Sequence, residues 1–238
     1  MKTRIVNWIK SEVKQAGAKG IVMGLSGGVD SSVVACLAKQ AVGKNRVLAL
    51  IMPCHSHLRD IQDARLVAKK LSLKTKVMDL SRIYDSLIKV LPEAGNLARV
   101  NLKPRLRMMV LYYFANKLNY LVCGTGNKSE LMVGYFTKHG DGATDILPIG
   151  CLLKREVKQL AKDLGVPQRI INKPPSAGLW LGQTDEGEMG ITYAQLDDIL
   201  ERLEHKQRQV LSKKKINKVK EMIKRSEHKR QGPKICRI

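Results

Sequence analysis

The chain of 238 residues lacks the features that mark secreted, zinc-binding and membrane proteins. Its five cysteines are odd in number and form no CxxC pair, which argues against a disulfide framework and against a zinc site. No apolar run approaches the roughly 18 residues that a membrane span needs. Residues 1–17 have the pattern of an amphipathic helix, without the apolar stretch or cleavage site of a secretory signal. We therefore expect a cytoplasmic protein that does not bind membranes.

Aromatic and acidic residues are also scarce. Two Trp, six Tyr and two Phe offer a poor supply of rings for stacking nucleic-acid bases. Because 43 Lys and Arg face 21 Asp and Glu, the net charge is +22, and residues 206–238 alone carry thirteen Lys and Arg against two Glu. This charge is typical of a solvated helix face, but it also suits attraction of polyanionic small molecules or of nucleic acid. Charge alone does not choose between these interpretations.

Short apolar runs without alternation recur between helical stretches, and they predict a doubly wound α/β fold. Such runs are typical of parallel strands that are covered on both faces, and we expect strands at 20–25, 46–52, 75–80 and 119–125. Helices are expected near 31–42, 60–71 and 98–118, and two more near 192–204 and 206–225. We expect one domain over 1–238, with a parallel sheet flanked by helices and a C-terminal helical part at about 192–238.

Two segments interrupt this alternation. Residues 134–150 are rich in glycine, and residues 172–190 contain adjacent prolines and several glycines. Long irregular connections in a compact domain are usually functional loops. Ligands of doubly wound sheets bind at the carboxyl ends of the strands, where the turns GLSGGVDSS (24–32) and GTGNKSE (124–130) are expected.

The turn GLSGGVDSS has the composition of a phosphate-binding turn. Its glycines let the backbone approach a phosphate, the hydroxyls of Ser26, Ser31 and Ser32 can donate, and a helix begins beside them. It lacks the lysine of the GxxxxGK[ST] loop, so it is not the usual P-loop. Asp30 is expected to repel phosphates unless a divalent cation lies between them; its alternative role is that of a helix N-cap.

This turn resembles the SGGxDS motif of the N-type ATP pyrophosphatases, whose fold is adenine nucleotide alpha hydrolase-like. Later segments narrow the resemblance to the NAD synthetases of that superfamily, in the same order and at similar spacing. These segments are GTGNKSE, YFTKHGDGATDILPIGCLLKREV, KPPSAGL, DEGEMGITYAQLDDIL and SEHKR.

The resemblance implies a ligase that amidates deamido-NAD to NAD. ATP adenylates the nicotinate carboxylate and releases pyrophosphate, and ammonia then displaces AMP. No segment resembles a glutaminase domain, so free ammonia is the expected nitrogen donor. The resemblance also implies a homodimer with the dinucleotide site across its interface, and the helix 98–118 and the C-terminal helices are candidates for that contact.

Site residues follow from the resemblance position by position. The ATP-binding residues implied are Gly24, Leu25, Ser26, Gly27, Gly28, Val29, Asp30, Ser31, Thr125, Lys154 and Ser176. The implied ligands of Mg²⁺ are Asp30 and Glu130, and two hard carboxylates suit this ion. The implied deamido-NAD contacts are Arg105, Lys138, Asp145, His228 and Lys229. Asp141 and Asp185 are candidates for accepting a proton from ammonium or ammonia.

Several of these residues also have plain structural interpretations. Glu130 and Arg107 fit solvent-facing helix positions, Lys154 fits the start of a helix, and His228 fits a surface histidine. The chain also departs from the family, because Gly178 stands where an aspartate is common, and His139 replaces a common aromatic residue.

Two rival functions remain open at the level of sequence. A tRNA-modifying ATP pyrophosphatase suits the net charge, but the CxxC pair of many thiolating members is missing and the length leaves little space for a tRNA-binding domain. A nucleic-acid-binding module that keeps an ATP-like fold suits the charge and conflicts with the scarcity of aromatic residues. We therefore do not expect a nucleic-acid partner.

Overall fold

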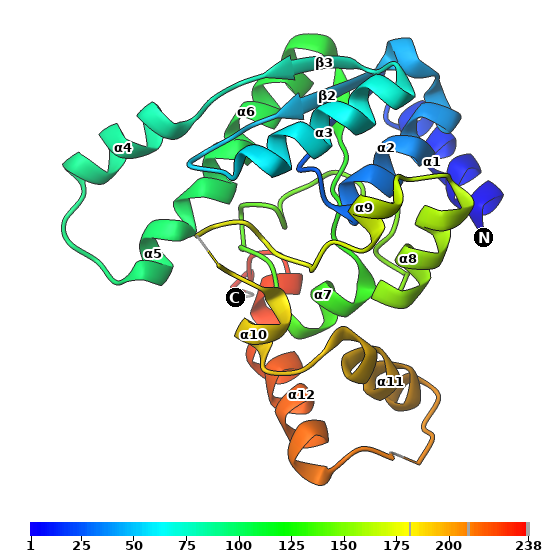
Figure 1. Cartoon of the computed structure of the whole chain (residues 1–238), viewed down its shortest axis with the longest axis vertical. Coiled ribbons are helices and arrows are strands. Elements are labelled where there is room, and N and C mark those ends of the chain that lie inside the picture. Colours follow the sequence, from blue (N-terminus) through cyan, green and yellow to red (C-terminus); the bar gives the residue numbers. More distant parts are fainter. Residues whose placement is uncertain (181, 209, 237–238) are drawn as a thin grey trace.

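The structure is a computed structural model, and it describes residues 1–180, 182–208 and 210–236. These residues form a parallel sheet between two layers of helices, as the sequence predicts (Figure 1). The strands of the sheet are β1 (Gly20–Gly24), β2 (Val47–Ile51), β3 (Lys74–Val77) and β4 (Tyr120–Val122). Their order is β3-β2-β1-β4, and every pairing is parallel. The carboxyl ends of β1, β2 and β4 therefore meet at one edge.

Helices surround this sheet and continue below it in Figure 1. The helices that precede β4 are α1 (Lys2–Gln15), α2 (Val29–Val42), α3 (Leu58–Leu71), α4 (Ser81–Val90), α5 (Asn96–Val100) and α6 (Leu102–Leu118), with a short 3₁₀ helix at Lys44–Arg46. Those that follow are α7 (Lys128–Val133), α8 (Lys154–Asp163), α9 (Gln168–Ile171), α10 (Asp185–Met189), α11 (Tyr193–Glu204), α12 (Lys213–Arg225) and α13 (Glu227–Arg230). No helix of the described chain combines the length and the apolar character that a bilayer crossing requires.

Alternate side chains of the central strands enter two separate apolar cores. Ile21 and Met23 of β1 pack with the helices α1, α2, α3 and α8, whereas Val22 packs with α6 on the opposite face. In β2, Ala49 lies in the first core and Leu50 in the second. Both faces of β1 and β2 are therefore covered, which explains why these strands are continuously apolar.

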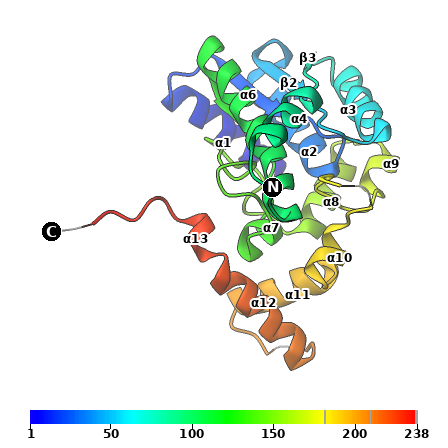
Figure 2. The same ribbon diagram turned by 90° about the vertical axis from the view of Figure 1, so that its left-hand side faces the viewer.

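A third apolar core lies outside the sheet and joins the C-terminal helices to α7. It is centred on Leu196 and Ile199 of α11, Val219 of α12 and Val133 of α7, all of which are buried. Figures 1 and 2 show these helices on one side of the body, and Figure 2 shows the chain after α13 extending away from it. Because α7 belongs both to this core and to the edge of the sheet, it connects the C-terminal helices to that edge.

Most predicted elements are confirmed, and the differences have local causes. The helix predicted at 98–118 is two helices that meet at Asn101, and the helix predicted at 206–225 begins only at Lys213, after Ser212. Residue 209, inside that prediction, lies outside the described residues. The segment 134–150 is irregular, as predicted, but 172–190 contains the helix α10, whose start Thr184 caps by accepting from Gly187 N–H. Residue 181 in this segment is also outside the described residues.

Candidate active site

The turn between β1 and α2 has a backbone that only glycine can adopt at one position. Gly27 has φ +81°, and a Cβ there would lie 2.4 Å from the carbonyl oxygen of Asp60 in α3. The fourteen-residue helix α2 begins directly after Gly28, so its first backbone N–H groups, which have no partner within the helix, face this turn. The turn therefore combines a close backbone approach with the positive end of a helix dipole, which favours an anion.

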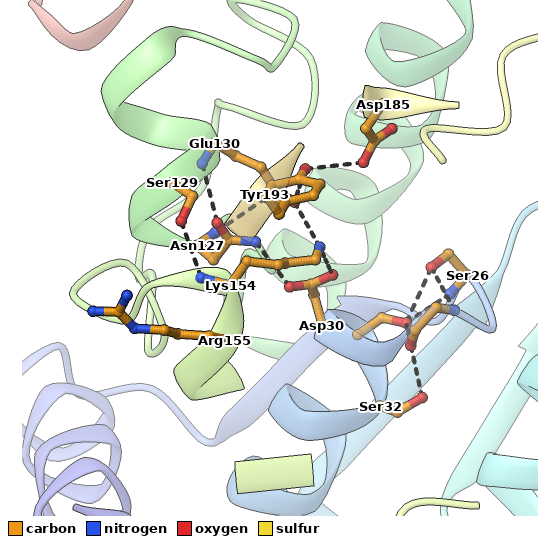
Figure 3. A network of polar contacts seen from close by, with 12 residues as sticks. Ser26, Asp30, Ser32, Asn127, Ser129, Glu130, Lys154, Arg155, Asp185 and Tyr193 are labelled. Atoms are coloured by element: carbon orange, nitrogen blue, oxygen red, sulfur yellow. Dashed lines mark hydrogen bonds and ion pairs between the residues drawn. The ribbon is translucent and has the colours of Figure 1, made fainter. Parts of the chain in front are cut away.

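The serines of the turn have different roles. Ser31 and Ser32 are buried, and both hydroxyls donate to the carbonyl oxygen of Gly28, at 3.1 and 2.7 Å (Figure 3). Ser26 is exposed, and its Oγ lies 3.0 Å from Ser31 Oγ. Ser31 and Ser32 therefore both stabilise the start of α2, and Ser31 also connects it to Ser26. Asp30 is not the N-cap, because Gly28 holds that position.

Asp30 and Glu130 converge on the ammonium group of Lys154 (Figure 3). Lys154 Nζ lies 2.7 Å from Asp30 Oδ2 and 3.0 Å from Glu130 Oε1, and its side chain is only 2% exposed. Asn127 Nδ2 donates to the other Asp30 oxygen at 2.9 Å. Lys154 is thus at the start of a helix, as one interpretation had it, but its charge lies inside the site rather than in solvent.

Glu130 is held by its own helix. Asn127 caps α7 by accepting from Glu130 N–H, and Asn127 N–H donates back to Glu130 Oε2 at 3.2 Å. The alternative that Glu130 is a solvent-facing helix residue is wrong, since 16% of its side chain is exposed. Burial raises the pKa of Glu130 to about 7, against the opposing effect of Lys154. Burial on its own would lower the pKa of Lys154, but the two carboxylates raise it overall.

A tyrosine connects this centre to Asp185. Tyr193 OH lies 3.0 Å from Asp185 Oδ2 and 3.3 Å from Glu130 Oε1, and the ring of Tyr193 lies 4.8 Å from Lys154 Nζ (Figure 3). Asp185 is 4% exposed, and burial raises its pKa. Its second oxygen, Oδ1, is buried without a hydrogen-bond partner in the part of the chain that the structure describes. Asp185 is therefore a third carboxylate directed at the same centre.

Two buried groups fix the start of α8, which carries Lys154. Ser129 Oγ accepts from Lys154 N–H at 3.0 Å and donates to Asp197 of α11. The second oxygen of Asp197 accepts from Arg155 N–H at 2.9 Å (Figure 3). The C-terminal helix α11 is thus needed to place Lys154, although it lies outside the sheet.

The donor set fits a magnesium ion only together with phosphates. Among the described residues, no group of three or more His, Cys, Asp or Glu is arranged to bind a metal. Asp30 and Glu130 do meet at one point, where the charge of Lys154 shows that a cation is stabilised. Mg²⁺ binds through one or two carboxylates plus phosphate oxygens and water, so these two residues match its usual protein ligands.

A small cavity lies beside Glu130. Its volume is about 50 Å³, and Thr125, Glu130, Phe136 and Asp141 are among the residues that line it. Asp141 Oδ1 accepts from Thr137 N–H at 2.8 Å. Desolvation of this carboxyl group raises the pKa of Asp141, although the residue as a whole is accessible to solvent. A cavity of this size is large enough for a molecule of water or ammonia.

The residues implied for the dinucleotide are partly brought together. Arg105 is exposed and donates to the carbonyl oxygen of Lys138, and Lys138 Nζ donates to the carbonyl oxygen of His228 at 2.6 Å. Lys229 Nζ donates to the carbonyl oxygens of Gly134 and Phe136, so it holds the loop that follows α7. Asp145 accepts from Tyr112 OH and Val122 N–H, which fixes it beside the end of β4.

Sequence reasoning missed several residues. Arg107 is not solvent-facing: its Nε donates to the carbonyl oxygen of Met52, at 3.0 Å, and its guanidinium contacts Ser56 Oγ beyond the end of β2. Burial lowers the pKa of Arg107. The sequence around Tyr193 does not mark it as a site residue. Asn127 could have been identified as a helix cap, because Asn127 and Glu130 have the N-x-x-E spacing of a capping box.

Comparisons with known proteins show which family the chain belongs to. A family model described as NAD synthase matches residues 1–233. The NH(3)-dependent NAD(+) synthetase of Archaeoglobus fulgidus is 51% identical, over 99% of this chain and 95% of the relative. The solved NMN synthetase of Francisella tularensis has a TM-score of 0.92 and 38% identity, over 100% of this chain and 97% of that one.

A second solved structure is an NH3-dependent NAD synthetase from Campylobacter jejuni, with a TM-score of 0.87 and 32% identity over 99% of this chain and 97% of that one. The match of the family model covers almost the whole chain, including the turn, Lys154 and the C-terminal helices. This chain belongs to the NAD synthase family.

Proposed function

We propose that the protein is an ammonia-dependent ligase that converts deamido-NAD to NAD and ATP to AMP and pyrophosphate. The observation that supports this most directly is the convergence of Asp30, Glu130 and Lys154 between the phosphate-binding turn and the small cavity. The 51% identity to a relative named NH(3)-dependent NAD(+) synthetase supports the same reaction.

The first half of the reaction uses the turn and Lys154. The turn from Gly24 to Ser31 binds the outer phosphates of ATP through backbone N–H groups, with Thr125 and Ser176 as further contacts. The nicotinate carboxylate attacks the α-phosphorus, and the bond to the pyrophosphate oxygen breaks. Lys154 neutralises negative charge on the phosphates. Asp30 and Glu130 are the residues that would hold Mg²⁺, which would supply positive charge to the phosphates.

The second half uses the cavity beside Glu130. Ammonia attacks the carbonyl carbon of the adenylated substrate, and AMP leaves with the bonding electrons. Ammonium is the main form near neutral pH, so a base must take its proton first. Asp141 lines the cavity and is the proposed base; Asp185, whose Oδ1 is buried without a described partner, is placed to stabilise the centre through Tyr193.

Deamido-NAD is proposed to bind beside this centre, along the surface formed by Arg105, Lys138, Asp145, His228 and Lys229. Arg105, Lys138 and His228 are linked in a chain of contacts, and Arg105 and His228 are exposed. Lys229 contributes by holding the loop at Gly134 and Phe136. A cytoplasmic location is part of the same proposal.

The protein is proposed to act as a homodimer. Large apolar side chains are exposed on α4, α5 and α6: Val90 is 77% exposed, Leu97 65%, Met109 61% and Tyr113 60%. Exposed apolar groups gathered on neighbouring helices are typical of protein interfaces. In Figure 1, α4 and α5 extend from the body next to α6.

A second candidate substrate is the mononucleotide form, nicotinate mononucleotide. The observation that favours it is the similarity to the Francisella tularensis structure described as an NMN synthetase. The dinucleotide remains the main proposal, because the more similar relative, at 51% against 38% identity, is named for NAD.

One assay decides between these functions. The chain is incubated with ATP, Mg²⁺ and ammonium, together with deamido-NAD or nicotinate mononucleotide, and NAD, NMN, AMP and pyrophosphate are measured. Equal amounts of NAD, AMP and pyrophosphate support the main proposal, and faster production of NMN supports the second. If neither acid is consumed and tRNA binds with a steep salt dependence, the tRNA-modifying alternative replaces both.

A further inference from the structure

Lys173, in the irregular segment after α9, is bound by two aspartates of α3 and has none of the roles described above. Its Nζ forms ion pairs with Asp60 and, at 3.0 Å, with Asp63 Oδ2. Arg169 of α9 binds the other oxygen of Asp63 at 2.8 Å. The side chain of Asp63 is 2% exposed, and a buried carboxylate of this kind needs such cationic partners. Four charged side chains thus join α9 and the segment after it to α3.

The part of α3 that carries these aspartates also supports the phosphate-binding turn. A Cβ at Gly27 would lie 2.4 Å from Asp60 O, 3.0 Å from Ala64 N and 3.0 Å from Asp63 Cβ. No side chain fits between the turn and α3. Since packed groups at such distances transmit displacement, the position of α3 at Asp60 and Asp63 determines where the turn can lie.

The segment that carries Ser176 also lies beside Asp60. A Cβ at Gly178 would be 3.9 Å from Asp60 Oδ2. One residue further, Leu179 O accepts from the buried Lys103 Nζ of α6 at 2.6 Å. Ser176, the proposed ATP contact, is therefore held between two anchors, Lys173 on α3 and Leu179 on α6.

We propose that Lys173 is a positioning residue for ATP. By bridging Asp60 and Asp63, it sets the spacing between the phosphate-binding turn and the segment of Ser176, and it does so through these aspartates rather than by touching the substrate. This inference rests on the proposed function, because it assumes that ATP binds between the turn and Ser176. Loss of the bridge should weaken ATP binding and leave the deamido-NAD and ammonium sites unchanged.

The test is the variant Lys173→Met. We expect its KM for ATP to rise about tenfold, the change that corresponds to about 1.4 kcal/mol. Its kcat and its KM for deamido-NAD should stay within about twofold of the wild-type values, a change no larger than the loss of a weak surface ion pair produces. The Kd of a non-hydrolysable ATP analogue, measured by calorimetry, should rise by the same factor as the KM. Lys173→Arg keeps the charge and should restore most of the affinity.

Lys70→Met is the matched control. Lys70 is on α3, the helix that carries Asp60 and Asp63, but its Nζ donates to Gly165 O, away from the turn. Its removal should leave the KM for ATP unchanged. If Lys173→Met proves unfolded, Asp60→Asn tests the same bridge with Asp63 still paired to Arg169, and it should show the same selective loss of ATP affinity.

Two outcomes would overturn the inference. One is an unchanged KM for ATP and an unchanged analogue Kd in Lys173→Met; the other is a loss of affinity for all substrates together with a lower Tm, which indicates a purely structural role. The Kd of the ATP analogue, measured by calorimetry, tests this inference separately from the proposed function. If wild-type protein makes no NAD, the proposed function fails, while the analogue Kd still decides whether Lys173 positions ATP.

Discussion

Lys154 Nζ lies 2.7 Å from Asp30 Oδ2, although 124 residues separate the two in the chain. This pair connects the turn after β1 to the start of α8, and Glu130 of α7 reaches the same ammonium at 3.0 Å. Three segments that are distant in sequence therefore meet at one buried charge. Removing Lys154 would leave two carboxylates without a counter-charge in a site with little access to water, whereas removing one carboxylate would leave a neutral ion pair.

Replacing Lys154 by Met is expected to abolish activity and to lower stability. The change leaves Asp30 and Glu130 facing each other without a counter-charge, and breaking a buried pair of this kind costs about 3–5 kcal/mol. For a chain of this length the Tm should fall by about 10 °C. Thermal unfolding of this variant and of Lys128→Met, which removes only the pair with the half-exposed Glu204, checks the prediction. Equal changes in Tm for the two variants would contradict it.

Asp30→Asn and Glu130→Gln should stop pyrophosphate release while the fold persists. Each variant removes one proposed ligand of Mg²⁺ but keeps the size of the side chain and some of its hydrogen bonds. Pyrophosphate release is measured across a range of Mg²⁺ concentrations, with Asp163→Asn as control. Asp163 is at the far end of α8, and its one side-chain hydrogen bond among the described residues is with Gln159. Near-normal release by either variant would remove the metal assignment.

Gly27→Ala should be far more damaging than Gly17→Ala. Both residues have positive φ, +81° and +61°, so both substitutions incur the left-handed penalty of about 1–2 kcal/mol. At Gly27 the new Cβ would also meet Asp60 O at 2.4 Å, whereas at Gly17 it would meet no atom within 4 Å among the described residues beyond its chain neighbours. We therefore expect Gly27→Ala to lose ATP-analogue binding and Gly17→Ala to keep it. Similar analogue Kd values in the two variants would show that the turn is not held rigidly against α3.

The strands and the position of the glycine-rich turn after β1 could be predicted because their signals are local. Ile21, Val22 and Met23 form an uninterrupted apolar run, and the glycines and serines follow it directly. Parallel strands then place the turn at the edge of the sheet. The break at Asn101 and the late start of α12 at Lys213 were missed, because helical pattern continues through both places and helix boundaries depend on local capping.

The roles of Arg107, Tyr193 and Lys173 could not be predicted, because their partners are distant in sequence. Arg107 contacts Met52 O, 55 residues away, and Tyr193 OH lies beside Glu130, 63 residues away. Nothing in the residues around Arg107 distinguishes it from a surface arginine. Ser32 differs from these residues, because its partner is local: its hydroxyl donates to Gly28 O, four residues earlier, at the start of α2.

Asp141→Asn should separate the two halves of the proposed reaction. Adenylation should continue, so AMP-linked intermediate and pyrophosphate form, while NAD formation slows about a hundredfold, which is typical for loss of a general base. Desolvation raises the pKa of Asp141, so the wild-type rate should fall as the pH drops through that raised pKa and the carboxyl group gains a proton. The variant should lack this acidic limb. Rapid-quench measurement of pyrophosphate and NAD at several pH values tests this, and an equal loss of both products would exclude Asp141 as the base.

Met109→Glu should disrupt the proposed dimer. Met109 is 61% exposed on α6, in the apolar region shared with Tyr113 and Leu97, and a charge placed there would be costly to bury in an interface. Leu58→Glu is the matched control, because Leu58 is 67% exposed at the start of α3, outside that region. Light scattering with size-exclusion chromatography should show a dimer for wild type and Leu58→Glu, and a monomer for Met109→Glu. A Met109→Glu protein that stays dimeric would place the interface elsewhere.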